Sequence, residues 1–142
     1  NTMLGYLDEP EETAKTLDRQ GWLKTGDIGV MNERGYLRIT DRQKDMFIVG
    51  GFNAYPAEIE NIVMKREDVA HVAVIGVPDQ RMGEVGKAYV VAKPNQTIDA
   101  TEFLSWCRDN MANFKVPRSV EFVAELPRNA TGKVQKFKLR EG

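Results

Sequence analysis

The sequence predicts an α+β fold, in which a small mixed sheet with flanking helices follows a β-hairpin segment. The run 69–77 is almost wholly apolar, which is typical of a strand covered on both faces, and 85–93 predicts a second strand. Two further segments carry apolar residues at the three- and four-residue spacing of an amphipathic helix. Helices alternate irregularly with strands, which favours an α+β fold or a small mixed sheet.

The first forty residues predict one short helix and one hairpin. The helix covers 8–17, with Asp8 as its expected N-terminal cap. Residues 22–31 and 36–40 predict two strands joined by a turn that ends in glycine, so the pair forms a hairpin.

The charged segment Asp41-Arg42-Gln43-Lys44-Asp45 is the best linker candidate, because both of its flanks are apolar. We therefore place a domain boundary at 41–45. The forty residues before this segment are too few for an independent domain, so we expect them to be the edge of a larger one. The chain begins without Met, and we expect it to be a piece of a longer protein.

The rest of the chain predicts the main sheet and its helices. We expect, in order, a strand at 46–49, a helix from Pro56, the strands 69–77 and 85–93, a helix from Asp99, a strand at 120–123 and a polar, mobile loop at 127–138 before a short terminal element. Ile59, Ile62 and Val63 form an apolar stripe on the first helix. Phe103 and Cys107 lie on the apolar side of the second.

Composition excludes several classes of protein. Hydrophobic residues make up 42% of the 142 residues, enough to bury a core, and the net charge of -1 argues against a nucleic-acid binder. A single cysteine, Cys107, excludes an internal disulfide and a cysteine-rich zinc site. We interpret His71 as structural and expect no metal ligands in this chain. No signal peptide and no apolar run of ~20 residues is visible, and we expect a cytoplasmic protein.

Two charged residues near the linker are candidates for binding a nucleotide. Asp27 follows a glycine turn, where a carboxylate can accept both hydroxyls of a ribose, although Asp is also common as a turn cap. Arg42 carries a rigid donor fork that suits ribose or phosphate oxygens, although a run of this composition is more often a solvated charged linker.

Two glycine-containing segments are further candidates. Gly50-Gly51 lets a backbone approach a ligand closely, or simply forms a tight turn. The polar loop 127–133 presents Lys133 after a glycine, but it is not a phosphate-binding loop, because Pro127 and Val134 stand where that motif needs Gly and Ser or Thr. Lys133 can contact an anion as a point charge, or belong to a solvated basic tail.

The order of these motifs resembles the C-terminal part of the adenylate-forming superfamily, which holds acyl-CoA synthetases, peptide-synthetase adenylation domains and luciferases. The resemblance covers nearly the whole chain. It is carried by Gly5-Tyr6, Pro10 to Thr13, Gly21-Trp22-Leu23-Lys24-Thr25-Gly26-Asp27, Gly35-Tyr36-Leu37, Asp41 to Asp45, Gly50 to Glu60, and Pro127 to Lys133. The stretch Phe52-Asn53-Ala54-Tyr55-Pro56 is most similar to fatty-acid and related carboxylate–CoA ligases.

The resemblance implies a two-step reaction: an acid and ATP give acyl-AMP and pyrophosphate, and CoA then gives acyl-CoA and AMP. By that template, residues 1–40 end a large N-terminal AMP-binding domain, 41–45 are the hinge, and 46–142 are a mobile C-terminal domain that alternates between two poses. The substrates are ATP with Mg²⁺, a fatty or related hydrophobic acid, and CoA. The metal is held mainly by the nucleotide and the missing domain, so this piece alone is expected to be inactive.

The resemblance also implies a role for each candidate residue. Asp27 matches the aspartate that binds the ribose hydroxyls, and Arg42 matches an arginine on ribose or phosphate. Lys44 matches the hinge position, and Lys133 matches the catalytic lysine that closes over the α-phosphate. Two further pairs match positions on the CoA side: Gly50 and Gly51 on the pantetheine passage, and Phe114 and Arg118 near the CoA nucleotide.

Two other functions remain open from the sequence. One is an adenylating enzyme that passes its acyl group to a carrier protein. The other is a non-catalytic nucleotide-binding or interaction module, which the joint presence of Asp27, Arg42 and Lys133 disfavours.

Overall fold

The computed structural model describes residues 2–140, which divide between Lys44 and Asp45 into two compact units. The division falls within the 41–45 segment. We call residues 2–44 the first unit and residues 45–140 the second unit, and describe each by itself. No helix among the described residues is both long enough and apolar enough to cross a membrane.

The first unit contains a short helix and a two-stranded antiparallel sheet. Its elements are α1 (Pro10–Thr16), β1 (Asp27–Met31) and β2 (Leu37–Arg42). The predicted helix and hairpin are therefore confirmed, but the predicted Asp8 cap is wrong. Asp8 adopts φ 57°, and the residue at the cap position, Glu9, makes no side-chain hydrogen bond to the helix.

Strand boundaries in the first unit differ from the sequence-based ones. The first strand starts five residues later than predicted, because the Lys24 N–H donates to the Thr16 carbonyl and ties this segment to α1. The second strand runs on into the charged segment, where Asp41 is buried and pairs with Ile28. Residues Gln43–Asp45 then form a single 3₁₀ turn, η1.

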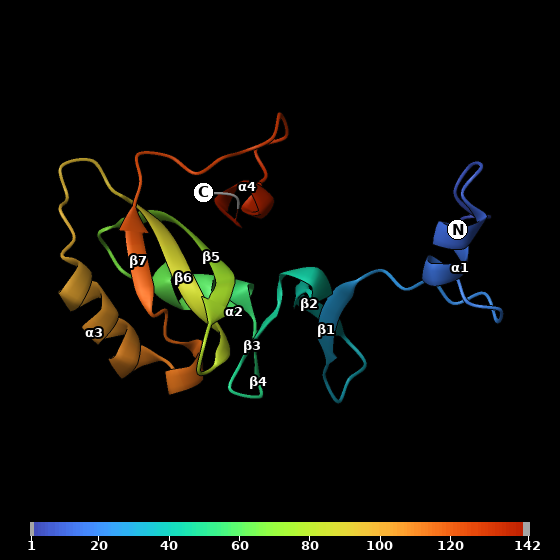
Figure 1. The fold of residues 1–142 in the computed structure, drawn as a ribbon, viewed down its shortest axis with the longest axis horizontal. Coiled ribbons are helices and arrows are strands. Elements are labelled where there is room, and N and C mark those ends of the chain that lie inside the picture. Colours follow the sequence, from blue (N-terminus) through green and yellow to red (C-terminus); the bar gives the residue numbers. More distant parts are fainter. Residues whose placement is uncertain (1, 141–142) are drawn as a thin grey trace. The chain divides into compact units, whose positions relative to one another are not determined.

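The second unit is built on a five-stranded mixed sheet (Figure 1). Its strands are β3 (Phe47–Val49), β4 (Phe52–Ala54), β5 (Val69–Asp79), β6 (Gly83–Ala92) and β7 (Ser119–Phe122). The order is β4-β3-β6-β5, with β7 also paired to β6. The β6–β7 pair is parallel and all other pairs are antiparallel, which confirms the predicted mixed sheet.

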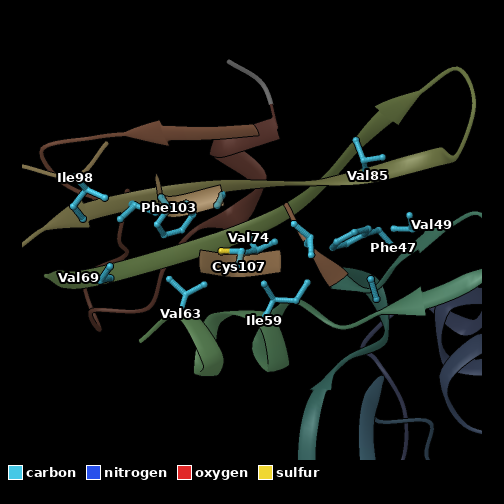
Figure 2. Packing of buried hydrophobic residues seen from close by; sticks show 14 residues of the cluster. Phe47, Val49, Ile59, Val63, Val69, Val74, Val85, Ile98, Phe103 and Cys107 are labelled. Atoms are coloured by element: carbon cyan, nitrogen blue, oxygen red, sulfur yellow. The ribbon is translucent and has the colours of Figure 1, made fainter. Parts of the chain in front are cut away.

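Helices α2 (Pro56–Val63) and α3 (Ala100–Asn110) contribute to the main core. Figure 2 shows Ile59 and Val63 of α2 lying in one apolar cluster with Phe103 and Cys107 of α3 and Val74 of β5. The Asp99 side chain accepts a hydrogen bond from the Glu102 N–H, so the predicted cap of α3 is confirmed.

A short C-terminal helix, α4 (Lys136–Arg140), packs on a second, smaller apolar cluster that contains Ala73, Ile75, Tyr89 and Leu126. Neighbours of Ala73 and Ile75 along β5 belong to the main core, so the two clusters lie on opposite faces of the sheet.

Two regions depart from the prediction in the second unit. Strand β4 was not expected, because three residues are too short to show a period. The segment 127–138, expected as a mobile loop, closes through a bridge between Arg128 and Val134 and leads directly into α4. A short 3₁₀ turn, η2 (Asn113–Lys115), precedes β7.

Candidate functional site

Asp27 and Arg42 form an ion pair across the hairpin of the first unit. They lie opposite each other in the β1–β2 register, and Arg42 Nε lies 2.9 Å from Asp27 Oδ1. The arginine side chain is 49% exposed and the aspartate 27%, so the pair adds only about 0–1 kcal/mol to stability. Both side chains therefore keep polar atoms available to a ligand.

A hollow of about 420 Å³ lies beside this pair and is lined by Thr25, Gly26, Arg42, Gln43 and Lys44. The turn at its wall depends on Gly26, whose φ is 73°, and on the Gln43 N–H, which donates to the Gly26 carbonyl at 2.8 Å. The Asp27 N–H donates to Thr25 Oγ1. Two cationic side chains and several backbone polar groups thus surround a space that can take an anion or a sugar hydroxyl.

Lys44 is an exposed residue of η1 at the end of the first unit. Asp45, the next residue, begins the second unit and faces Arg140 of α4, with Arg140 Nη2 3.4 Å from Asp45 Oδ1. The segment that the resemblance assigns to a hinge is therefore ordered on both sides of the division.

Gly50 and Gly51 form the two-residue turn of the β3–β4 hairpin, with φ values of 55° and 90°. Such positive φ values at both positions are typical of a tight hairpin turn and favour glycine. A Cβ on Gly50 would also lie 2.6 Å from Met82 Cε, whereas one on Gly51 would meet open space. The turn connects two strands, and Gly51 leaves a bare backbone at its tip.

An aromatic pair lies next to this turn. Phe52 follows Gly51 directly and stacks on Phe114, with ring centroids 5.1 Å apart and planes inclined by 22°. The Lys115 ammonium lies 5.4 Å from the Phe114 ring centroid and 2.5 Å from Glu58 Oε1. Phe52 keeps 60% of its surface exposed, so the stack borders solvent with a cation at its side.

The positive charge of Arg118 influences Asp79, a residue close to the β3–β4 turn. The N–H groups of Met82 and Arg81 donate to the Asp79 carboxylate and, with the positive charge of Arg118, hold the pKa of that carboxyl below its usual value. Met82 in turn accepts the Gly50 N–H through its carbonyl, at 2.9 Å. The structure thus brings Gly50, Gly51, Phe114 and Arg118 into one region of the second unit.

Lys133 lies on a small closed loop, residues 128–134, which we call the lysine loop. Asn129 organises it: its Oδ1 accepts hydrogen bonds from the Thr131 N–H, the Thr131 hydroxyl and the Lys133 N–H, at 3.1, 2.8 and 2.8 Å. Gly132 adopts φ 82°. The Lys133 side chain is exposed, and no carboxylate of residues 2–140 lies within ion-pair distance of its ammonium.

The chain beyond the lysine loop is anchored to the sheet. Glu60 Oε1 accepts both the Val74 N–H and the Lys136 ammonium, each at 2.7 Å. The Tyr89 hydroxyl donates to the Leu139 carbonyl at 3.0 Å. The lysine loop and the β3–β4 turn lie at different edges of the second unit (Figure 1).

Two residues, Cys107 and His71, could suggest other chemistry. Cys107 is buried in the main core, and this burial raises the pKa of its thiol to about 11, so the nucleophilic thiolate is disfavoured. His71 is an exposed residue of β5, and among residues 2–140 no group of three or more His, Cys, Asp or Glu side chains could hold a metal ion.

Sequence reasoning missed several residues of these sites. Phe52 and Lys115 gave no local signal, since their partners lie far away in the chain. Asn129 could have been found, because Asn two residues before Thr and three before Gly is typical of a side-chain-closed turn.

Comparison with known proteins identifies relatives of the whole chain. The AMP-binding enzyme C-terminal domain family matches residues 58–133. A "3-[(3aS,4S,7aS)-7a-methyl-1,5-dioxo-octahydro-1H-inden-4-yl]propanoyl:CoA ligase" of Rhodococcus jostii (strain RHA1) is 62% identical over 99% of this chain and 27% of its own length. A long-chain-fatty-acid–CoA ligase of Salmonella typhimurium is 48% identical over 98% of this chain and 24% of its length. The chain therefore spans about a quarter of these relatives.

Solved structures are similar as well. ATP-bound MatB from Rhodopseudomonas palustris matches 97% of this chain and 27% of its own, with 45% identity and a TM-score of 0.92. The apo form of the same protein covers 96% of this chain and 27% of its own, at 46% identity, with a TM-score of 0.71.

Proposed function

Because this chain belongs to the AMP-binding enzyme C-terminal domain family, we propose that it is the C-terminal portion of an ATP-dependent carboxylate–CoA ligase. In the first step a carboxylate oxygen attacks the α-phosphorus of ATP, which forms the acyl phosphate bond and expels pyrophosphate. In the second step the CoA sulfur attacks the acyl carbonyl, loses its proton and expels AMP. The first unit ends the large domain, and the second unit is the mobile one.

The observation that carries this proposal is the presentation of Lys133. An ammonium on an ordered loop, exposed and without an ion-pair partner among residues 2–140, is available to neutralise charge that builds on the α-phosphate oxygens. At 4 Å and an effective dielectric of ~20, such a charge contributes about 4 kcal/mol before desolvation costs. Lys133 is the catalytic residue of the adenylation step in this proposal.

The first unit supplies the nucleotide contacts. Asp27 accepts the ribose hydroxyls, and Arg42, fixed by its ion pair with Asp27, donates to ribose or phosphate oxygens. In this proposal a Mg²⁺ ion would be held by the ATP phosphates and the large domain. When bound, the ion neutralises phosphate charge.

The second unit supplies the CoA contacts from the β3–β4 turn and the residues beside it, and not from the lysine loop. The bare backbone at Gly51 leaves room for the narrow pantetheine arm, and the exposed Phe52–Phe114 stack fits a flat nucleobase. Arg118 adds a positive charge for the CoA phosphates. These groups lie away from the lysine loop, which supports separate use of the two segments.

Two observations support a large domain ahead of the hinge. Every buried hydrophobic side chain found among residues 2–140 belongs to the second unit, whereas Val30, Leu37 and Ile39 of the first unit are more than half exposed. Apolar strands of this kind need a partner surface. The chain also spans only about a quarter of the length of the CoA ligases that it matches, so these relatives carry a large part outside the matched stretch.

The acid is proposed from the relatives. The 62% identical ligase is named after a ring-bearing propanoate, and the 48% identical ligase after long-chain fatty acids. Both are carboxylates with a large apolar body. We propose a hydrophobic acid of this class, with the ring-bearing propanoate as the first substrate to test.

The test is a substrate screen on the full-length parent that follows AMP release. Acyl-CoA formation from one of these acids, dependent on ATP and CoA, is the expected result. Transfer to an acyl carrier protein in place of CoA would reassign the acceptor. AMP binding without turnover of any acid would reassign the protein to a non-catalytic module.

A further inference from the structure

We propose that Asn129 is a positioning residue that holds Lys133 in the geometry used for adenylation. This inference rests on the proposed role of Lys133, and it concerns a side chain that itself touches no substrate. It follows from the hydrogen bonds of the lysine loop.

Asn129 makes two hydrogen bonds to Lys133 and one to the preceding residue, Gly132. Its side-chain oxygen accepts the Lys133 N–H at 2.8 Å, and its backbone N–H donates to the Lys133 carbonyl at 2.9 Å. The Asn129 carbonyl also accepts the Gly132 N–H at 2.9 Å. Both peptide groups that flank the Lys133 Cα are therefore bonded to one residue, which restricts the backbone dihedrals from which the lysine side chain extends.

The same oxygen shapes the turn that precedes the lysine. It accepts both the backbone N–H and the hydroxyl of Thr131, and Gly132 completes the turn at φ 82° with no atom within 4 Å of where a Cβ would stand. The Arg128 guanidinium adds one bond to the Gly132 carbonyl at 2.8 Å. Loss of the Asn129 amide would leave three donors without their common acceptor.

These bonds hold the loop and not the core. Asn129, Thr131 and Lys133 are all exposed, and none belongs to either apolar cluster. Their donors can bond to water once Asn129 is removed, so the fold should persist. What changes is the fraction of time that the loop spends in the closed turn.

A charge that stabilises a transition state is effective only when it is already in place, because reorientation during the reaction costs part of the gain. The lysine side chain has four rotatable bonds of its own, and a loose backbone adds further freedom. An error of about 1 Å in a catalytic group can cost up to about 10²-fold in rate. We expect Asn129→Ala to reduce the rate of acyl-AMP formation about tenfold.

The experiment uses the full-length parent and measures the two half-reactions separately. Asn129→Ala should slow acyl-AMP formation and leave thioester formation from supplied acyl-AMP within twofold of the wild type. Asn129→Ser keeps a short acceptor for the same turn and should recover part of the rate. Asn110→Ala is the matched control, since it removes an exposed asparagine bond, to the Trp106 carbonyl, outside the loop.

A double-mutant cycle distinguishes positioning from general structural damage. In a Lys133→Ala background there is no ammonium to position, so Asn129→Ala should cause no further loss of adenylation. Multiplicative losses, equal losses in both half-reactions, or a wild-type rate for Asn129→Ala would each overturn the positioning role. A wild-type adenylation rate for Lys133→Ala would instead refute the catalytic role of Lys133, and the positioning role with it, whereas a wild-type parent that forms no acyl-AMP would refute the proposed function.

Discussion

The lysine loop and the β3–β4 turn belong to one folded unit but present opposite kinds of surface. The loop uses an asparagine side chain to close a turn and to project a long cationic side chain. The β3–β4 turn uses two glycines to remove side chains and to expose bare backbone beside an aromatic stack. One segment suits the neutralisation of phosphate charge, the other suits a narrow thiol arm, and each should therefore matter for a different half-reaction.

We expect the largest effect from a substitution in the lysine loop. In the parent enzyme, Lys133→Ala should lower the rate of acyl-AMP formation about 10²–10³-fold, because one preorganised stabiliser of the transition state is lost. Pyrophosphate exchange measures this step. Thioester formation from supplied acyl-AMP should change little.

Lys138→Ala is the matched control, because Lys138 is an exposed lysine of α4 outside the loop. Equal losses in both half-reactions for Lys133→Ala would remove the distinction between the two segments.

A second test concerns the proposed hinge, which would bring either the lysine loop or the β3–β4 turn into use. Lys44→Pro fixes one φ angle in η1 and restricts the residue before it, so it should hold the second unit in one pose. One half-reaction should fall about 10²-fold while the other is retained. Lys44→Ala, which leaves the backbone free, should preserve both, and unchanged kinetics for Lys44→Pro would count against a hinge here.

The β3–β4 turn is tested by Gly51→Ala. A side chain at φ 90° is strained by about 1–3 kcal/mol, and it also fills the space above the bare backbone. Thioester formation should fall about tenfold with adenylation retained, as single-turnover assays with supplied acyl-AMP would show. Gly35→Ala, with φ 79° and equally open surroundings in the first unit, imposes the same strain elsewhere and should spare the thioester step.

The smallest effect concerns the aromatic stack. Phe114→Ala removes the partner of Phe52, and base stacking on such rings typically contributes about 1–3 kcal/mol. The KM for CoA should rise about fivefold while the KM for ATP stays constant. A larger change for ATP than for CoA would place the stack in the other half-reaction.

Local patterns predicted the elements whose signals are strong and contiguous. Helix α2 begins at Pro56 as expected, and α3 is capped by Asp99 and buries Phe103 and Cys107. Strand β5 ends two residues later than predicted, and β6 starts two residues earlier and ends one residue earlier than predicted. In each case the local preference and the tertiary packing agree.

The errors arise where tertiary contacts override local composition. Asp41 and Arg42 have the composition of a solvated linker, yet they continue β2 because Ile28 and Asp27 pair with them. Of the candidate site, the resemblance predicted the charged and glycine positions and Phe114, but not the stacking of Phe52 on Phe114, which joins residues 62 positions apart and has no periodic signature. The role of Asn129 depends on hydrogen-bond geometry, which composition does not encode.

The contact between Lys136 and Glu60 limits how far the Lys133 ammonium can reach. Only two residues lie between Lys136 and Lys133, and Glu60 is tied to β5 through the N–H of Val74. The tail therefore has little slack, and in the proposed mechanism the Lys133 ammonium should move together with the sheet and helices of the second unit. If the second unit rotates as we propose, a connection this short turns that rotation directly into a displacement of a single positive charge.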